Sequence, residues 1–516
     1  MVAPPPLPFA TNNQNHRKGR AVKLIVATIA SIKFFATTSP HREASKSSQK
    51  APGMDAGNGN RIISGSGSRN SNTDGRSEGQ SHVESQQGSS KQHSRYSIAT
   101  LLDTLRSWWA YLNQLTSSSP SKPMIPDGLT LEEAAQYETL LRVVEARRAD
   151  GTKPPRVVVI TDLAKDYDDL AAMVVLKELH RVGCVKLMGF IANLMPAMDR
   201  ARFGRGALDE LDLQLIPIAR GTSGFPESGF KKHKILDYEF DCDFMADQDD
   251  PRLVTQKGED LLLRLCQDAI RSGDKLTLLL ISSLEDIFTF SLKYPNELRA
   301  AVSNIILQGG YTISEGKLEP DESANNNRYD FEAAQKFHTF MQESKIPTTV
   351  YTKVAAFATP LTSQLFGEMA ETKHPLGKHL RHVQTFQNLA FYRSASSKDP
   401  KERFAPFMDQ EWFLRNRSSW FNVHHEPGTP YPKDEELIPY LTKVVIYDAL
   451  AALGAAGSDA LHDLNVLRID DQEASIHKIV GKAGPPSDPG INPEQMALVL
   501  SALLKGSLLS CQQGIR

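Results

Sequence analysis

The sequence is poor in cysteine and has no excess of charge of either sign. Only four of its 516 residues are cysteines, and these lie far apart without a CxxC pair. Such spacing does not indicate a zinc cluster or the disulfide scaffold of a small secreted domain. We expect free thiols in a reducing compartment, with a disulfide between Cys184 and Cys266 as the alternative. The formal net charge of −2 gives no general attraction to nucleic acid, so no nucleic-acid partner is predicted.

A long uninterrupted hydrophobic run is also missing. The best candidate, residues 21–38, contains Lys23 and Lys33 and falls short of the roughly 20 apolar residues that span a membrane. We therefore expect no membrane anchor. Acidic residues are absent before Glu43, while basic and hydroxyl residues are present. Such a leader resembles an organellar transit peptide. An untargeted tail is the alternative, so the predicted location is intracellular, in either the cytoplasm or an organelle.

The composition changes along the chain and suggests three regions. Residues 1–95 are rich in Ser, Asn, Gln and Gly and have too few apolar residues to offset the chain entropy lost on folding. We predict a disordered low-complexity leader there. Residues 96–150 are expected to form a helical segment and linker, with Thr130 and Glu133 as a capping box at the start of a helix. Residues 151–510 are predicted to form the main domain.

Within the main domain, apolar runs of strand length alternate with amphipathic helical stretches. This order is typical of an α/β fold with a doubly wound, mostly parallel central sheet flanked by helices. A small helical subdomain is expected around Trp412 and Trp420. The candidate strands are 156–161, 185–191, 213–219, 276–281, 305–307 and 348–352. The candidate helices are 169–181, 199–211, 257–271, 284–292, 331–343 and 439–453.

The most informative segment is TDLAKDYDD, residues 161–169, which follows the first strand and opens a helix. It carries four carboxylates, those of Asp162, Asp166, Asp168 and Asp169. Crowded acids repel one another, so their presence at a strand end indicates a bound cation. Their hard oxygen atoms favour Ca²⁺ or Mg²⁺ over Zn²⁺. The alternative is a solvated loop whose acidic residues cap the following helix.

Polar residues follow the other strands in a recognisable order. Asn193 follows the second strand, a Gly-rich QGGY segment ends the fifth, and NNNRYDFEAA begins at Asn325. Near the end of the domain, VVIYDAL spans residues 444–450. This series resembles the inosine/uridine-preferring nucleoside hydrolase superfamily. The resemblance implies a Ca²⁺-dependent hydrolase that cleaves the N-glycosidic bond of ribonucleosides or ribonucleoside-like compounds, as in purine and pyrimidine salvage. It also makes a homo-oligomer plausible.

The resemblance assigns a metal site to four residues. Asp162 resembles the aspartate that ligates calcium and activates the attacking water. Asp169 resembles the bidentate calcium ligand, and Asp448 the late aspartate that completes the site. The backbone carbonyl of Ile281 stands where the family uses a carbonyl oxygen. Ca²⁺ is therefore the expected cofactor, in preference to Mg²⁺.

The resemblance also assigns residues to the substrate. Asp168 resembles the acceptor of a ribose hydroxyl, and Asn193 and Asn326 resemble the amides that hold the sugar. Tyr447 stands where many members carry a histidine that protonates the departing base. A tyrosine, with its usual pKa of ~10, is a weaker acid at neutral pH than an imidazolium. Ala324 replaces a glutamate that often contacts the sugar in this family, so the resemblance does not identify the substrate.

The acidic segment departs from the family pattern. It has Leu163 and Ala164 where Pro-Gly is customary, and it is two residues longer before the paired aspartates. An insertion of Lys165 and Asp166 keeps Asp162 at the position of the general base, and we prefer this alignment. Asp166 is then either an extra ligand or a loop residue. These departures leave a catalytically impaired nucleoside hydrolase-like binding protein as the alternative function. The sequence argues against a third alternative, a Mg²⁺ phosphohydrolase, because the DxDxT motif of such enzymes is missing.

Overall fold

The computed structural model describes residues 123–226, 235–254, 256–424, 428–468 and 476–515. The predicted leader and the segment before residue 123 lie outside the described residues. Within these ranges, none of the helices combines the length and the apolar character that a membrane span requires.

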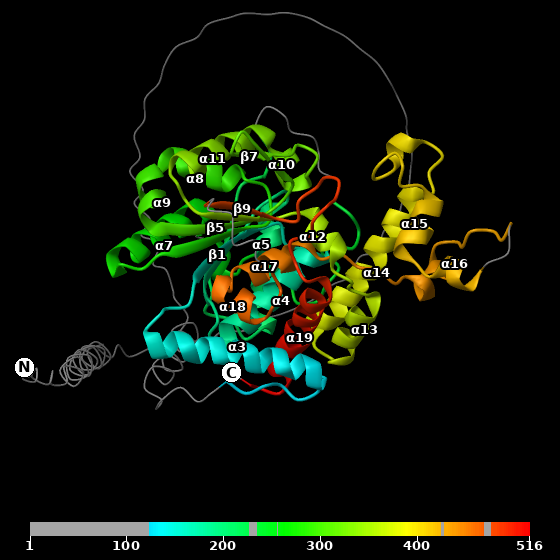
Figure 1. The fold of residues 1–516 in the computed structure, drawn as a ribbon, viewed down its shortest axis with the longest axis horizontal. Helices are drawn as coiled ribbons and strands as arrows, with labels where there is room; N and C mark the ends of the chain where they lie inside the picture. Colours follow the sequence, from blue (N-terminus) through cyan, green and yellow to red (C-terminus); the bar gives the residue numbers. More distant parts are fainter. Residues whose placement is uncertain (1–122, 227–234, 255, 425–427, 469–475, 516) are drawn as a thin grey trace, which may run out of the picture. The chain divides into compact units, whose positions relative to one another are not determined.

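A seven-stranded parallel sheet forms the centre of the domain (Figure 1). The strand order is β3-β2-β1-β4-β5-β8-β9. The chain runs outward from β1 in one direction and from β4 in the other, which confirms the doubly wound arrangement. Because β1 and β4 are neighbours, their carboxyl ends lie at the switch point where α/β folds bind ligands. The strands are β1 (Arg156–Thr161), β2 (Lys186–Ala192), β3 (Ile218–Arg220), β4 (Leu276–Leu280), β5 (Val302–Gln308), β8 (Thr348–Tyr351) and β9 (His477–Val480).

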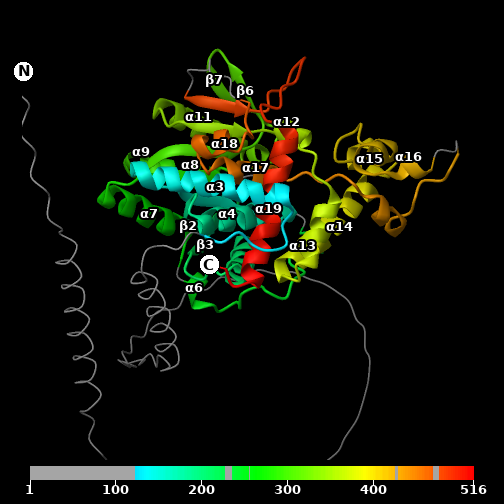
Figure 2. The same cartoon turned by 60° about the horizontal axis from the view of Figure 1, so that its bottom comes forward.

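Helices cover both faces of the sheet, which explains why its central strands are continuous apolar runs. Along β1, Val157 and Val159 face one hydrophobic cluster, whereas Val158 and Ile160 face the other. The first face carries α3 (Leu131–Asp150), α4 (Tyr167–Val182), α5 (Ala197–Glu210), α17 (Tyr447–Gly454), α18 (Ser458–Asp463) and α19 (Pro493–Gln512). The second carries α7 (Gly258–Ser272), α8 (Glu285–Lys293), α9 (Pro295–Ala301) and α11 (Phe331–Glu343). Figure 2 shows α3, α4, α17 and α19 lying close together.

Two packing contacts position the acidic segment. The start of α4 lies directly after β1, and α17 packs along α4. Ala449, Ala451 and Ala452 of α17 are fully buried, and these small side chains allow a close approach. Residues separated by nearly three hundred positions are thereby brought together.

The capping box predicted at Thr130 and Glu133 is present at the start of α3. The Thr130 hydroxyl accepts from the Glu133 N–H at 3.2 Å, and the Glu133 carboxylate accepts from the Thr130 N–H at 2.9 Å. Gly151 caps the end of the helix, and its φ of 78° is a conformation that glycine adopts without strain.

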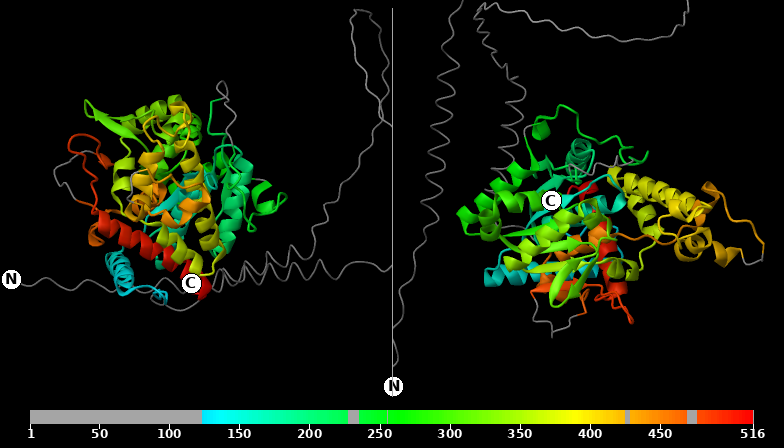
Figure 3. Two further views of the ribbon diagram at one scale, coloured as in Figure 1. Left: turned by 90° about the vertical axis from the view of Figure 1, so that its right-hand side faces the viewer. Right: turned by 90° about the horizontal axis from the view of Figure 1, so that it is seen from above.

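A small helical subdomain extends from the main domain, as predicted (Figure 3). It consists of α14 (Pro375–Ala395), α15 (Gln410–Arg417), α16 (Trp420–Val423) and the 3₁₀ helices η2 (Pro400–Glu402) and η3 (Glu435–Tyr440). Its own hydrophobic cluster includes Tyr392, Phe413 and Trp420, with Trp412 packed against it. The remaining elements are α6 (Pro251–Val254), β6 (Tyr311–Ser314), β7 (Lys317–Pro320), α10 (Asn325–Tyr329), α12 (Lys353–Ala358) and α13 (Ser363–Glu371).

Two sequence predictions of local structure were wrong, and three strands were not predicted. The strand predicted at 213–219 is β3 alone, because a turn with a left-handed Asp212 and then Pro217 delay its start. The helix predicted at 439–453 begins only at Tyr447, since the β-branched stretch before it runs extended. The β6–β7 hairpin and β9 were not predicted, because neither contains a long apolar run.

Candidate functional site

The acidic segment forms a tight loop at the carboxyl end of β1. The N–H of Lys165 donates to the carbonyl of Asp162 at 3.0 Å, which closes a turn. Ala164 has a φ of 69°, a left-handed conformation that costs a residue with a side chain some strain. The Asp166 carboxylate then accepts from the N–H of Asp168 at 3.2 Å and caps α4. Asp168 and Asp169 therefore occupy the first turn of the helix, as the sequence predicted.

Asp169 is fixed against the end of β1. One of its oxygens, Oδ1, accepts from the hydroxyl of Thr161 and from the N–H of Asp162, the latter at 3.1 Å. Asp162 and Asp169 are both buried, with exposures of 4% and 2%. Their carboxylates are held by the strand end and the first helical turn, which are rigid elements.

Asp168 and Asp448 meet across the contact between α4 and α17. The N–H of Tyr447 donates to Oδ2 of Asp168 at 3.2 Å. Asp448 follows directly, and its carboxyl group lies near that of Asp168, because each of the two influences the pKa of the other. Asp448 is 5% exposed. Asp448 and the acidic segment 161–169 thus lie together at one buried site.

The four buried aspartates repel one another strongly. Burial raises the pKa of Asp168, Asp169 and Asp448 well above the usual value, and neighbouring aspartates raise each of them further. Burial also raises the pKa of Asp162, although Lys165 and Arg200 oppose this shift. One oxygen from each of Asp166, Asp168 and Asp169 lies within 4.8 Å of the others. This surplus of buried, hard oxygen ligands fits a divalent cation.

Asn193 lies beside the cluster, but its amide is engaged by protein groups. Its Nδ2 donates to the carbonyl of Ser283 at 3.0 Å and to Oδ2 of Asp286 at 2.8 Å. Its Oδ1 accepts from the hydroxyl of Ser282, and Ser282 also lies beside Asp162 and lowers its pKa. Ser282 thus links Asn193 to the neighbourhood of Asp162.

The remaining predicted site residues lie at neighbouring strand ends. Asn326, at the start of α10, donates from Nδ2 to Oε1 of Gln308 at 2.7 Å. Ile281 follows β4, and its N–H donates to the carbonyl of Ile160 at 3.0 Å. The Tyr447 ring packs edge-on against Phe357 at 5.9 Å. Burial raises the pKa of Tyr447 to about 12.

Two cations near the cluster were missed as functional residues by the sequence analysis. The Nζ of Lys165 donates to the hydroxyl of Tyr329 at 2.8 Å. Although burial opposes the charge, Tyr329 and the nearby aspartates raise the pKa of Lys165. Arg200, fully buried on α5, donates to the carbonyl of Leu163 at 2.9 Å and to the carboxylate of Glu239 at 2.9 Å. These contacts span distant segments, so no local pattern indicates them.

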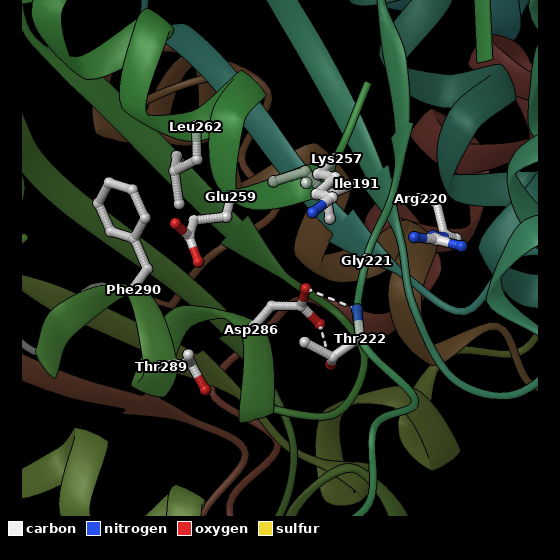
Figure 4. A pocket seen from close by; sticks show the side chains of 11 residues that line it. Ile191, Arg220, Gly221, Thr222, Lys257, Glu259, Leu262, Asp286, Thr289 and Phe290 are labelled. Carbon is white, nitrogen blue, oxygen red and sulfur yellow. Dashed lines mark hydrogen bonds between the residues drawn. The ribbon is translucent and has the colours of Figure 1, made fainter. Parts of the chain in front are cut away.

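Asp286 is one of the residues that line a cavity of about 170 Å³ (Figure 4). Its apolar wall is formed by Ile191, Leu262 and Phe290. Asp286 accepts from the N–H and the hydroxyl of Thr222, at 2.9 and 2.7 Å. Because Asp286 also accepts from Asn193, hydrogen bonds connect the cavity wall to Ser282, beside the acidic cluster.

No protein-family model matches the sequence, and no curated protein matches it. Among solved structures, the type III effector protein XopQ, complexed with adenosine diphosphate ribose, aligns with a TM-score of 0.61 and 24% identity. That alignment covers 74% of this chain and 100% of XopQ. The effector protein XOO4466 aligns with a TM-score of 0.60, 24% identity and coverages of 74% and 99%.

A purine-preferring ribonucleoside hydrolase from Gardnerella vaginalis is also among the matches. It has a TM-score of 0.41 and 14% identity, and the alignment covers 68% of this chain and 99% of that one. Identities at this level concern the fold alone. The chain shares the fold of XopQ, which is a nucleoside hydrolase-like fold, here with a seven-stranded parallel sheet flanked by helices.

Proposed function

We propose that the acidic cluster holds a divalent cation and that the protein hydrolyses the N-glycosidic bond of ribonucleosides or ribonucleoside-like compounds, giving ribose and free base. The observation that supports this most directly is the meeting of Asp448 with Asp168 across the α4–α17 contact. Two acids from opposite ends of a domain, both buried, are costly to hold together without a positive charge between them.

Four residues are proposed to hold the cation: Asp162, Asp169, Asp448 and Ile281, the last through its backbone carbonyl. The described part of the cluster offers only oxygen ligands, and several of these are carboxylates. Ca²⁺ accepts six to eight such ligands in a flexible geometry, whereas Mg²⁺ demands a stricter octahedron. We therefore propose Ca²⁺, with Asp166 as an additional ligand or as the helix cap only.

The proposed chemistry follows from the residue types. A bound Ca²⁺ would position the vicinal hydroxyls of the sugar and lower the pKa of the attacking water. Asp162 is proposed to take the proton of that water at a carboxylate oxygen. Asp168 is proposed to accept a hydrogen bond from a ribose hydroxyl. The nearby carboxylates would favour the positive ribosyl centre that develops as the base departs.

The amides and the tyrosine are given supporting roles. Asn326 retains its Oδ1 for a sugar hydroxyl while its Nδ2 is fixed by Gln308. For Asn193, whose amide is engaged, we propose that it holds Ser282 and Asp286 and contacts the sugar only if a hydrogen bond is exchanged. Tyr447, with a pKa of about 12, is proposed to donate a hydrogen bond to the leaving base without transferring its proton.

A binding protein without hydrolytic activity is the second candidate. The strained Ala164 and the Tyr447 position, which carries histidine in many members of the resembled family, favour it. The XopQ structure contains adenosine diphosphate ribose, which is a ribonucleoside-like compound. We therefore include this compound among the test ligands for the present chain.

The deciding experiment is a reducing-sugar assay of the full chain with purine and pyrimidine ribonucleosides and adenosine diphosphate ribose, with and without chelator. We expect activity that is lost on chelation and in Asp169→Ala. The control Asp268→Ala alters a half-exposed aspartate on α7, paired only with Arg271, and should retain activity. Ca²⁺ binding without sugar release from any compound would instead support the binding protein.

A further inference from the structure

Arg417 differs from the other buried arginines in the described residues. The buried arginines are Arg147, Arg200, Arg205 and Arg417. The first three each form an ion pair, with Asp459, Glu239 and Asp209 respectively. Arg417 is 8% exposed, and no carboxylate of the described ranges lies within 4.0 Å of its guanidinium. A buried cation without a counter-charge is costly, so this one calls for an explanation.

Aromatic rings and backbone hydrogen bonds hold Arg417 in place. Its guanidinium lies over the rings of Phe357 and Phe391, 5.6 and 5.7 Å from their centroids. Its own carbonyl accepts from the N–H of Thr442 at 3.1 Å. The last residue of α15 is thus joined to the extended segment that leads into α17. The position of the guanidinium is fixed by the fold and does not depend on an ion pair.

A second cation lies next to Arg417. The Nζ of Lys443 donates to the carbonyl of Phe357 at 3.0 Å. Burial lowers the pKa of Lys443, and the charge of Arg417 lowers it further. In the described residues no carboxylate lies within 4.0 Å of this ammonium group either. Two neighbouring positive charges therefore share a partly buried place that contains no acid of its own.

This pair of cations adjoins the acidic cluster. The ring of Phe357, over which the Arg417 guanidinium lies, packs edge-on against the ring of Tyr447 at 5.9 Å, and the N–H of Tyr447 donates to Asp168. Arg417 also acts electrostatically on Tyr167, at the start of α4. A compound bound at the cluster therefore lies near the two cations.

We propose that Arg417, with Lys443 beside it, binds a phosphate group of the compound that occupies the acidic cluster, so that the site prefers phosphate-bearing ribosyl compounds to neutral nucleosides. The inference rests on the proposed function only in taking the cluster as the site of the sugar. A guanidinium binds phosphate through two parallel hydrogen bonds, and the aromatic rings hold its plane without competing for its N–H donors. The phosphate would supply the negative charge that no carboxylate of the described residues provides to Arg417 and Lys443.

The test compares pairs of ligands that differ in phosphate, by calorimetry on the full chain with Ca²⁺ present. Ribose 5-phosphate is compared with ribose, and adenosine 5′-monophosphate and adenosine diphosphate ribose with adenosine. We expect at least one phosphate compound to bind tighter than its neutral counterpart by on the order of tenfold or more. Arg417→Met should abolish this preference, and Lys443→Met should weaken it.

Arg415→Met is the matched control, because Arg415 lies on the same helix, is 60% exposed and is paired with Glu411. It should keep the full preference. Arg417→Lys tests whether charge alone suffices, and thermal unfolding of each variant identifies any that fails to fold. Equal binding of all pairs by the wild type, or a preference that survives both Met substitutions, would overturn the inference.

The two proposals fail separately. Hydrolysis of nucleosides without any preference for phosphate contradicts the role of Arg417 and leaves the proposed hydrolase intact. A phosphate preference that depends on Arg417, with no release of sugar from any compound, supports the role of Arg417 and contradicts the proposed hydrolase.

Discussion

The backbone N–H of Tyr447 donates a hydrogen bond to Oδ2 of Asp168 at 3.2 Å, although the two residues are 279 positions apart. Tyr447 begins α17, and Asp168 lies in the first turn of α4. The positive ends of two helix dipoles therefore face the same group of acids. Each dipole is equivalent to only about half a unit charge. The fold thus compensates part of the negative charge and leaves the rest for a cation.

Replacing Asp448 by Asn should stabilise the cation-free protein and abolish cation binding. The pKa of Asp448 is higher in the folded state than in the unfolded chain, where it is about 4. Asp448 therefore destabilises the folded state as the pH rises above about 4, and this effect is complete above the folded pKa. The gain from Asp448→Asn should therefore grow as the pH rises above about 4 and disappear below about pH 4. We expect the melting temperature in chelator to rise by about 5 °C.

Thermal unfolding of both proteins, with chelator and with excess Ca²⁺, checks this prediction. The wild type should gain stability from Ca²⁺, whereas Asp448→Asn should not. Asp463→Asn, at an exposed position on α18, serves as the control and should change neither value. A variant that is less stable than the wild type in chelator would show that Asp448 is satisfied without a cation.

The sequence predicted the fold well because its signals are local. The run RVVVIT is apolar on both faces, which only a strand buried between two layers of helices requires. The segment TDLAKDYDD directly follows it, and Asp166, Asp168 and Asp169 lie where helix capping puts them.

The sequence could not predict contacts that depend on tertiary packing. Asn193 was assigned to the sugar from its place after β2, but its amide bonds Asp286 and Ser282 from another strand end. No sequence motif marks Arg417, because its distinguishing feature is that no carboxylate of the described residues pairs with its guanidinium. Such features follow from three-dimensional charge balance, which a one-dimensional pattern does not contain.

Asp286 is predicted to orient the cluster through Asn193 and Ser282. Asp286→Asn replaces an acceptor by a donor opposite Asn193 or Thr222, so one hydrogen bond to a charged group is lost. We expect Ca²⁺ affinity, measured by calorimetry, to fall on the order of tenfold. Ser282→Ala should cause a similar loss, and the double variant should lose less than the product of both, because they act in one chain.

Glu259→Gln is the matched control for Asp286. Glu259 lines the same cavity, but among the described residues its carboxylate bonds only Lys293 and Tyr294. Its substitution should leave Ca²⁺ affinity unchanged. Independent, multiplicative losses in the double variant would show that Asp286 and Ser282 do not act through Asn193.

Tyr447 should contribute little by proton transfer. Burial raises its pKa to about 12, so near neutral pH the phenol keeps its proton and is a poor acid. We expect Tyr447→Phe to lower kcat less than about tenfold, whereas Asp162→Asn should lower it at least about a hundredfold. Steady-state kinetics on the best substrate of the reducing-sugar assay compares the two. A loss for Tyr447→Phe as large as for Asp162→Asn would identify the phenol as the leaving-group acid.

His338 should make the fold sensitive to mild acid. It is 1% exposed, its Nδ1 lies 2.7 Å from the carbonyl of Ala334, and its Nε2 is buried without a hydrogen-bond partner in the described residues. Burial lowers its pKa to about 4 from 6.5. The imidazole therefore binds a proton below about pH 6.5 in the unfolded chain, but only below about pH 4 in the folded chain. The free energy of unfolding should decrease as the pH falls from about 6.5 to about 4.

Urea unfolding near pH 7 and near pH 5 measures the effect, which should be about 2 kcal/mol for this residue. His338→Phe preserves the stacking on Tyr311 and should remove that part of the pH dependence. The rest should remain, because His379 also has a pKa lowered by burial to about 4. The control His462→Phe, at an exposed position, should keep the wild-type dependence. An unchanged pH dependence in His338→Phe would mean that the folded protein accommodates the imidazolium, for instance by opening a path for water to Nε2.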